Sequence, residues 1–296
     1  MDVTQSSDTQ RSETPVVQGF GDRLVAALAE RAPLCVGIDP SAQLLARWEL
    51  TDDAAGLRAF ATAVLDAVEG KVSIVKPQSA FFERHGSAGI AALEELCRDA
   101  RSRELLVLLD VKRGDIGSTS QAYAQAYLQS DSPLAVDAVT AAPYLGVASL
   151  APLFDAAQAS GRGVFVVARS SNPEGVHIQD ARVDGGTDVV GHVLGEVAGV
   201  NAKAPGAVLG SIGTVFGATC ETTGYDLAGT GGPILAPGLG AQGATVDDIA
   251  LRFAGCRRQV VPSASRSILR LGPDVASMRA ATTDLAAACR RALHET

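Results

Sequence analysis

Residues 105–128 read "LLVLLDVKRGDIGSTSQAYAQAYL", an apolar run that stops abruptly at charged residues before an Ala/Tyr/Gln segment of helical character. A continuous apolar run of this kind is typical of a strand that is buried on both faces. Three charges of both signs, Asp110, Lys112 and Asp115, follow at the end of that run. The stretch therefore predicts a buried strand, then a helix, with a charged cluster between them that burial alone does not favour.

The same pattern recurs along the chain. Short apolar, β-branched runs are each followed by a polar or glycine-rich tip and then by a longer amphipathic segment. There are eight such runs: "LCVGIDP" from Leu34, "VSIVKPQ" from Val72, "LLVLLDVK" from Leu105, "AVDAVTAAPY" from Ala135, "GVFVVARSS" from Gly163, "AVLGSIGTVF" from Ala207, "PILAPGLG" from Pro233 and "QVVPSASRS" from Gln259. Strand-then-helix units spaced by roughly 30 residues predict a (β/α)8 TIM barrel in a single domain. An open doubly wound sheet is the alternative, because periodicity does not show closure.

Three further segments add to this organisation. Residues 51–70, "TDDAAGLRAFATAVLDAVEG", predict a helix that begins with Thr51 as its capping residue. An insertion at about residues 172–205 is long enough for a loop and a helix near residues 187–201, and is either a lid over the strand tips or decoration. Residues 1–17 are polar and predict a disordered tail, which leaves residues 18–296 for the barrel domain.

Composition excludes several classes of function. A net charge of -8, a pI near 5.0 and the lack of a basic stripe argue against nucleic-acid binding. No apolar run is long enough to span a bilayer, and the first residues lack an apolar signal core, so we expect a cytoplasmic protein without membrane contact. The five cysteines are scattered without metal-ligand spacing, which predicts reduced thiols and no metal site.

The residues that end the strands are the candidates for chemistry, since barrel active sites form at the carboxyl ends of the strands. In chain order these ends supply Asp39, Lys76, Asp110 with Lys112 and Asp115, Ser170 with Ser171, Gly238 with Gln242, and Arg266. Residues two apart on a strand share a face, so Asp110 and Lys112 should point into the barrel mouth and Arg113 elsewhere. Lys76 would then complete an alternating array of carboxylates and lysines, which favours the ammonium form of the lysines.

Each of these residues also has a plain structural interpretation. Asp110 and Lys112 could form a simple ion pair, but buried pairs are costly to desolvate and add little net stability, so their presence at one strand tip suggests function. Gly114 would permit a sharp turn, after which Asp115 could cap the next helix. Glycine-rich "APGLGAQG" and Arg266 in "PSASRSI", after the last two strands, indicate a phosphorylated substrate because barrels commonly bind phosphate there.

With these residues assembled, the chain resembles the orotidine 5'-phosphate decarboxylase family, in its longer bacterial type. The matching motifs are "GIDP", "VKPQSAFFE", "DVKRGDIGST", "TAAPYLG", "SNPEG", "PGLGAQG" and the late "SRS". The resemblance extends from about Phe20 to the C-terminus. Two departures concern the phosphate side: the loop after the seventh strand is short, and no glycine precedes Arg266 as in the shorter family members.

The resemblance implies a set of catalytic residues: Lys112, Asp110, Asp115 and Lys76. It also implies a set of substrate-binding residues: Asp39, Lys76, Ile116, Thr119, Ser171, Pro237, Gly238, Gln242 and Arg266. In this interpretation Lys112 donates the proton, Asp110 lies against the substrate carboxylate, and Lys76 holds Asp110 while binding the ribose together with Asp39.

Further roles follow from the same resemblance. Asp115 would reach into the active site of the other subunit of a homodimer, with Ile116 and Thr119 lining that shared site. Ser171 would hydrogen-bond the pyrimidine edge, while Gln242 and Arg266 would hold the phosphate.

The reaction that the resemblance implies is conversion of orotidine 5'-phosphate to uridine 5'-phosphate, the last step of de novo UMP biosynthesis. It needs no metal and no other cofactor, so preorganised charge must stabilise the ring carbanion before Lys112 protonates it. Two alternatives remain: a magnesium-dependent sugar-phosphate decarboxylase of the keto-gulonate phosphate type, which shares the DxKxxD strand, and a non-catalytic nucleotide-phosphate-binding barrel.

Overall fold

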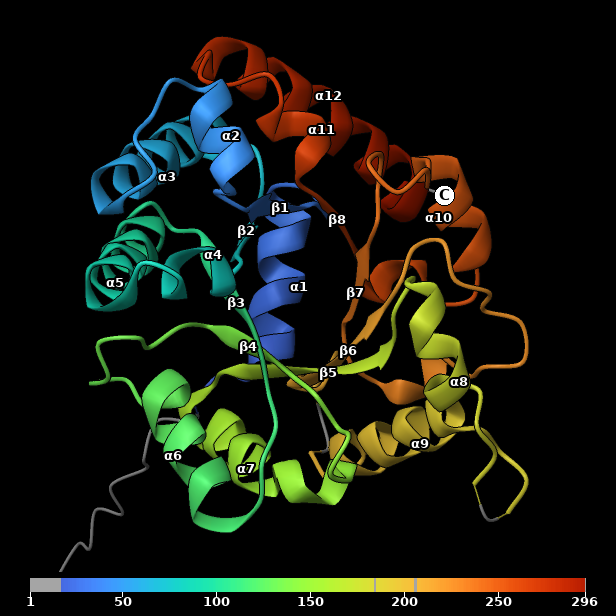
Figure 1. Cartoon of the computed structure of the whole chain (residues 1–296). Coiled ribbons are helices and arrows are strands. Elements are labelled where there is room, and N and C mark those ends of the chain that lie inside the picture. Colours follow the sequence, from blue (N-terminus) through green and yellow to red (C-terminus); the bar gives the residue numbers. More distant parts are fainter. Residues whose placement is uncertain (1–16, 184, 205–206, 296) are drawn as a thin grey trace, which may run out of the picture.

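Parallel strands close into a barrel in the computed structural model, which describes residues 17–183, 185–204 and 207–295 (Figure 1). The strands follow one another in chain order: β1 (Cys35–Ile38), β2 (Ile74–Pro77), β3 (Leu106–Arg113), β4 (Ala138–Ala141), β5 (Gly163–Arg169), β6 (Ile212–Phe216), β7 (Ile234–Pro237) and β8 (Val260–Ala264). β1 pairs in parallel with both β2 and β8, so the sheet has no open edge. The predicted TIM barrel is confirmed and the open-sheet alternative is wrong. Apart from Val17, the predicted tail lies outside the described residues.

Helices surround this barrel, except α1, which lies across one end of it, as Figure 1 shows. They are α1 (Phe20–Glu30), α2 (Ala42–Arg47), α3 (Ala54–Val68), α4 (Ala80–Glu83), α5 (Gly86–Ser102), α6 (Gly117–Leu128), α7 (Ala151–Ser160), α8 (Val176–Gln179), α9 (Val189–Asn201), α10 (Val246–Arg252), α11 (Arg266–Leu269) and α12 (Val275–His294). In the part of the chain that the structure describes, no helix is both long and apolar enough to cross a membrane.

Two apolar cores hold the barrel together. The larger core lies between the strands and the outer helices, where the outward side chains of the strands meet the apolar faces of the helices. The smaller core fills the barrel interior and includes the buried face of α1. Phe20 of α1 packs edge-on against Phe165 of β5, with ring centroids 5.9 Å apart. Helix α1 thus covers the amino-terminal end of the barrel and leaves the carboxyl end for a site.

Of two predicted helix boundaries, one needs correction and the other is confirmed. The N-cap of α3 is Asp53, whose carboxylate accepts hydrogen bonds from the backbone N–H groups of Ala55 and Gly56, at 2.9 Å each. The prediction of Thr51 as the cap was wrong, because its hydroxyl instead donates to Asp53 Oδ1 at 2.8 Å. The helix expected near residues 187–201 is α9, which has Asp188 as its N-cap.

The interior core predicts a contrast between two leucine substitutions. Leu24 of α1 is fully buried, whereas Leu251 of α10 is 76% exposed. Leu24→Ala should lower the free energy of unfolding by about 2–5 kcal/mol, since it leaves a cavity in the barrel interior. Leu251→Ala, the matched control, should change it by less than about 0.5 kcal/mol. Urea denaturation measures both, and equal effects would contradict the assigned role of α1.

Candidate active site

A cavity of about 260 Å³ opens at the carboxyl ends of the strands, where the sequence predicted the site. Residues from β2 to β7 and the loops that follow them line it: Lys76, Gln78, Asp110, Lys112, Thr140, Val167, Arg169, Ser170, Ser171, Val215, Gly217, Leu235 and Pro237. The lining combines polar side chains with the apolar Val167, Val215 and Leu235, which belong to or pack against the interior core of the barrel. Such a mixture suits a flat organic ring that carries polar substituents.

The Asp110 carboxylate lies between two lysines. Lys76 Nζ donates to Asp110 Oδ2 at 3.0 Å, and Lys112 Nζ donates to Asp110 Oδ1 at 2.5 Å. The side chains of Lys76 and Asp110 are each only 9% exposed, whereas that of Lys112 is 50% exposed. The buried pair therefore fixes the carboxylate, and the second ammonium faces the open part of the cavity.

Burial and charge act in opposite directions on this pair. Burial raises the pKa of Asp110, but the Lys76 and Lys112 ammonium groups outweigh it and lower that pKa to about 2. Burial likewise lowers the pKa of Lys76, and the nearby Asp110 and Asp39 carboxylates more than offset it, so the net pKa is raised. Asp110 and Lys76 are consequently both charged at neutral pH.

Strand β1 contributes Asp39, directly after its last residue. Ser265, which follows β8, donates its hydroxyl to Asp39 Oδ2. The other oxygen, Oδ1, is buried without a hydrogen-bond partner among the described residues. Gly37 permits this arrangement, because a Cβ there would lie 2.8 Å from Ser265 Cβ. Asp39 Oδ1 therefore has unused capacity to accept a hydrogen bond, but Asp39 lies outside the residues that line the cavity.

The structure explains the glycine and the carboxylate in the loop between β3 and α6, and it excludes the capping role that Asp115 could have had. Gly114 does not make its turn through a positive φ; glycine is needed there because a Cβ would lie 2.2 Å from the backbone oxygen of Ala142. Asp115 does not cap α6, since its Oδ1 accepts from the neighbouring Ile116 N–H at 2.8 Å and the N-cap residue is Ile116. Ile116 and Thr119 are both exposed and lie outside the residues that line the cavity.

Arg113 points away from the cavity, as predicted. Its guanidinium donates to Glu83 at 2.6 Å and to the Tyr127 hydroxyl at 3.4 Å, and it lies 5.7 Å from the centre of the Tyr123 ring. The outward contacts of Arg113 thus anchor the end of β3 on the helix side, opposite the cavity.

The predicted phosphate residues are only partly brought together. Pro237 lines the cavity, and Gln242 Oε1 accepts a hydrogen bond from the Ser171 hydroxyl at 2.9 Å. Gly238 has a φ of 120°, and a Cβ there would lie 2.8 Å from Gln242 Oε1. Arg266 is exposed at the start of α11, outside the lining of the cavity. The loop after β7 therefore meets the loop after β5 across the rim, and Arg266 lies beyond it.

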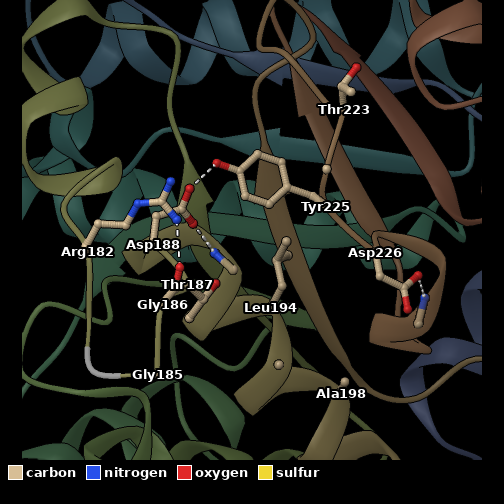
Figure 2. A pocket seen from close by; sticks show the side chains of 14 residues that line it. Arg182, Gly185, Gly186, Thr187, Asp188, Leu194, Ala198, Thr223, Tyr225 and Asp226 are labelled. Carbon is tan, nitrogen blue, oxygen red and sulfur yellow. Dashed lines mark hydrogen bonds between the residues drawn. The ribbon is translucent and has the colours of Figure 1, made fainter.

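The insertion between β5 and β6 is tied to the rim of the cavity. Arg169, the last residue of β5, forms an ion pair with Asp180, and Gln179 exchanges two hydrogen bonds with Ser170. Beside these contacts lies a larger hollow of about 680 Å³ (Figure 2). There the Tyr225 hydroxyl donates to Asp188 Oδ2 at 2.7 Å, which joins the insertion to the loop after β6. Because Arg169 and Ser170 line the cavity, the insertion supports its wall rather than lying apart from it.

Sequence reasoning missed three polar residues that line the cavity, namely Gln78, Thr140 and Arg169. Thr140 stands inside an apolar run and Gln78 follows a proline, so neither was selected as a strand end. The fourth strand contributed no candidate at all. The only polar side chain of β4 is Thr140, one residue before its carboxyl end. This place at the strand end could have marked Thr140 as a candidate.

Comparisons with known proteins identify similar sequences. The model of the orotidine 5'-phosphate decarboxylase / HUMPS family matches residues 32–281. A relative from Salinispora arenicola, named orotidine 5'-phosphate decarboxylase, is 56% identical over 277 residues, which cover 94% of this chain and 99% of the relative. A relative of the same name from Nocardioides is 56% identical over 260 residues, covering 86% of this chain and 94% of the relative.

A solved structure shows the same likeness. The crystal structure of a Streptomyces avermitilis protein assigned to the same activity superimposes with a TM-score of 0.90. The two sequences are 50% identical, and the match covers 93% of this chain and 96% of that one.

The charge of Asp110 predicts a pH effect on stability. Its pKa is lower in the folded protein, about 2, than in an unfolded chain, about 4, so its stabilising contribution is present above pH 4 and is lost as the pH falls toward 2. Between pH 5 and pH 3, the free energy of unfolding of Asp110→Asn should therefore fall by about 1 kcal/mol less than that of the unsubstituted protein. Urea denaturation at both pH values measures this, and Asp155→Asn, on an exposed face of α7, controls for the loss of one carboxylate. Identical pH dependence in Asp110→Asn and the unsubstituted protein would contradict the assignment.

Proposed function

This chain belongs to the orotidine 5'-phosphate decarboxylase / HUMPS family and decarboxylates orotidine 5'-phosphate to uridine 5'-phosphate in pyrimidine biosynthesis, and we propose that Lys112, Asp110 and Lys76 carry the chemistry. One observation supports this assignment above the others. A buried carboxylate is held between two ammonium groups at the end of the cavity, with one of those groups 50% exposed toward it.

The proposed mechanism follows from that arrangement of charge. The bond between the ring carbon and the substrate carboxylate breaks, carbon dioxide leaves, and the electron pair remains on the ring carbon. The Lys112 ammonium offsets the developing negative charge and then transfers one proton from Nζ to that carbon, after which water restores the proton. Lys76 keeps Asp110 ionised and in place, so that Lys112 is oriented before the substrate arrives.

Substrate binding is proposed to use the rim of the cavity. Asp39, with its unpartnered Oδ1, and Lys76 would bind the ribose hydroxyls. Ser171 would hydrogen-bond the pyrimidine edge. The phosphate would lie where the loops after β7 and β8 begin, held by Gln242 and by Arg266, whose side chain would have to turn toward the cavity. Pro237 and Gly238 would line the substrate site beside them.

A homodimer is proposed to complete the site, with Asp115 of one subunit reaching into the cavity of the other and Ile116 and Thr119 lining it. The surface around Asp115 supports this proposal. Ile116 is 61% exposed, Tyr144 79% and Leu145 53%. The two loops that carry them run side by side, since the backbone N–H of Ala142 donates to the oxygen of Arg113 at 2.9 Å. Exposed apolar side chains grouped in this way favour a contact between subunits.

We further propose that the enzyme works in the cytoplasm. All five cysteines are buried free thiols, which suits a reducing compartment.

The first test of the mechanism is Lys112→Ala. The substitution removes the proposed proton donor, so the release of carbon dioxide from orotidine 5'-phosphate should fall by at least about 10³-fold while the fold is retained. Lys203→Ala, an exposed lysine after α9, is the matched control and should keep the activity of the unsubstituted enzyme. A folded Lys112→Ala protein with near-normal turnover would overturn the role given to Lys112.

The second test concerns the shared site. Lys112→Ala and Asp115→Ala chains should each be inactive alone, because each lacks one group of the proposed site. After subunit exchange, a mixed dimer contains one site with both groups intact, so up to about half of the activity of a normal dimer per mixed dimer should return. Exchange is verified by differently tagged chains. Full exchange without any recovered activity would exclude a site shared in this way.

A further inference from the structure

We infer that Thr140 is a positioning residue of this active site, whose hydroxyl joins the backbone that carries Lys112 to the carboxylate of Asp110. The inference rests on the proposed role of Lys112. Thr140 belongs to β4, is 1% exposed and lines the cavity beneath the charged residues.

The pairing of β3 with β4 creates the need for this residue. Leu109 pairs with Val139, and the next pair is Arg113 with Ala141, so the register shifts between them. Three residues of β3, from Asp110 to Lys112, therefore lie opposite the single residue Thr140. A bulge of this kind takes backbone N–H groups out of the regular ladder, and these groups need other partners when they are buried.

The hydroxyl of Thr140 supplies those partners. Its oxygen accepts hydrogen bonds from the backbone N–H of Val111 at 3.0 Å and from that of Lys112 at 2.9 Å. Its hydrogen is donated to Asp110 Oδ1 at 2.8 Å. A hydroxyl offers two lone pairs and one proton, so all three are used. Since a backbone N–H can only donate, the direction of the bond to Asp110 is determined as well.

Lys112 depends on this support. Its φ is 44°, in the left-handed region that costs energy for a residue with a long side chain. This conformation turns the chain so that Lys112 Nζ returns to Asp110 Oδ1, the same oxygen that accepts from Thr140. One hydroxyl therefore holds both ends of the Asp110–Lys112 contact: the backbone of the lysine and the carboxylate that its ammonium meets.

The consequence for the reaction is specific. Without the hydroxyl, the N–H groups of Val111 and Lys112 lose their acceptor and the Lys112 conformation is no longer secured. The ammonium would then be misplaced with respect to the reacting ring carbon. The product lacks the carboxylate that is lost, and its ribose and phosphate are proposed to bind elsewhere on the rim, so its binding should depend little on Thr140.

The decisive variant is Thr140→Val, which replaces the hydroxyl by a methyl group of similar size. We expect kcat for orotidine 5'-phosphate to fall about 10- to 100-fold, the range for loss of a hydrogen bond to a charged group. KM and the Kd of uridine 5'-phosphate should each stay within about threefold. Thr140→Ser keeps the hydroxyl and should restore kcat to within about threefold of the unsubstituted enzyme.

A matched control exists on β6. Thr214 is fully buried, and its hydroxyl has no hydrogen-bond partner within the described residues. Thr214→Val should therefore leave kcat unchanged, which separates the loss of the Thr140 hydroxyl from the general effect of valine in a strand. If Thr140→Val does not fold, Thr140→Ala removes the same hydroxyl without adding a second methyl group and is assayed in its place.

Two results would overturn the inference: a kcat within threefold of normal in Thr140→Val, or a Thr140→Ser enzyme as impaired as Thr140→Val. The second result would show that the methyl packing matters and not the hydroxyl. Failure of the proposed role of Lys112 is a different result, namely near-normal turnover in Lys112→Ala. Failure of the reaction itself would appear as an unsubstituted enzyme that releases no carbon dioxide from orotidine 5'-phosphate.

Discussion

The contact between Lys76 and Asp110 is the interaction on which the rest of the site depends. Both side chains are buried, and removing two charges from water costs more than their attraction returns unless their other hydrogen-bonding capacity is also used. Asp110 meets that condition by accepting from Lys76, Lys112 and Thr140. These partners come from β2, β3 and β4, so the arrangement requires three neighbouring strands in the correct register.

Closure of the barrel and the packing of its interior hold the three strands in that register. Closure through the β1–β8 pair leaves no sheet edge, and α1 fills the opposite end with apolar side chains. The interior below the charged residues is therefore dry and packed. The charged residues at the carboxyl ends of the strands therefore have the apolar, low-dielectric interior of the barrel on one side and the open cavity on the other. This asymmetry strengthens the interactions of Asp110 and still leaves Lys112 half exposed to a substrate.

The two sides of the cavity are held by different kinds of contact. On the β2–β4 side, the bulge, the Thr140 hydroxyl and the outward anchor of Arg113 hold β3 from both faces. On the opposite side, the loop after β5 meets the loop after β7 through the contact of Ser171 with Gln242. The proposed chemistry thus lies on the β2–β4 side, and the proposed base and phosphate contacts lie on the loops across the cavity from it.

The sequence by itself determined the order and type of the strands, because buried parallel strands require continuous apolar runs, and eight such runs alternate with amphipathic segments along the chain. It also placed Asp39, Lys76, Asp110 and Lys112 at one end, since the carboxyl ends of parallel strands meet at the same rim. Local details were harder to predict: Asp53 caps α3 and accepts from the Thr51 hydroxyl, while Asp115 accepts from the Ile116 N–H and does not cap α6. Only the tertiary structure decided the closure of the sheet, the support that the insertion gives to Arg169 and Ser170, and the part played by Thr140. These features depend on contacts between separate segments of the chain or on a register shift between strands. The apolar periodicity of the sequence indicates neither of these.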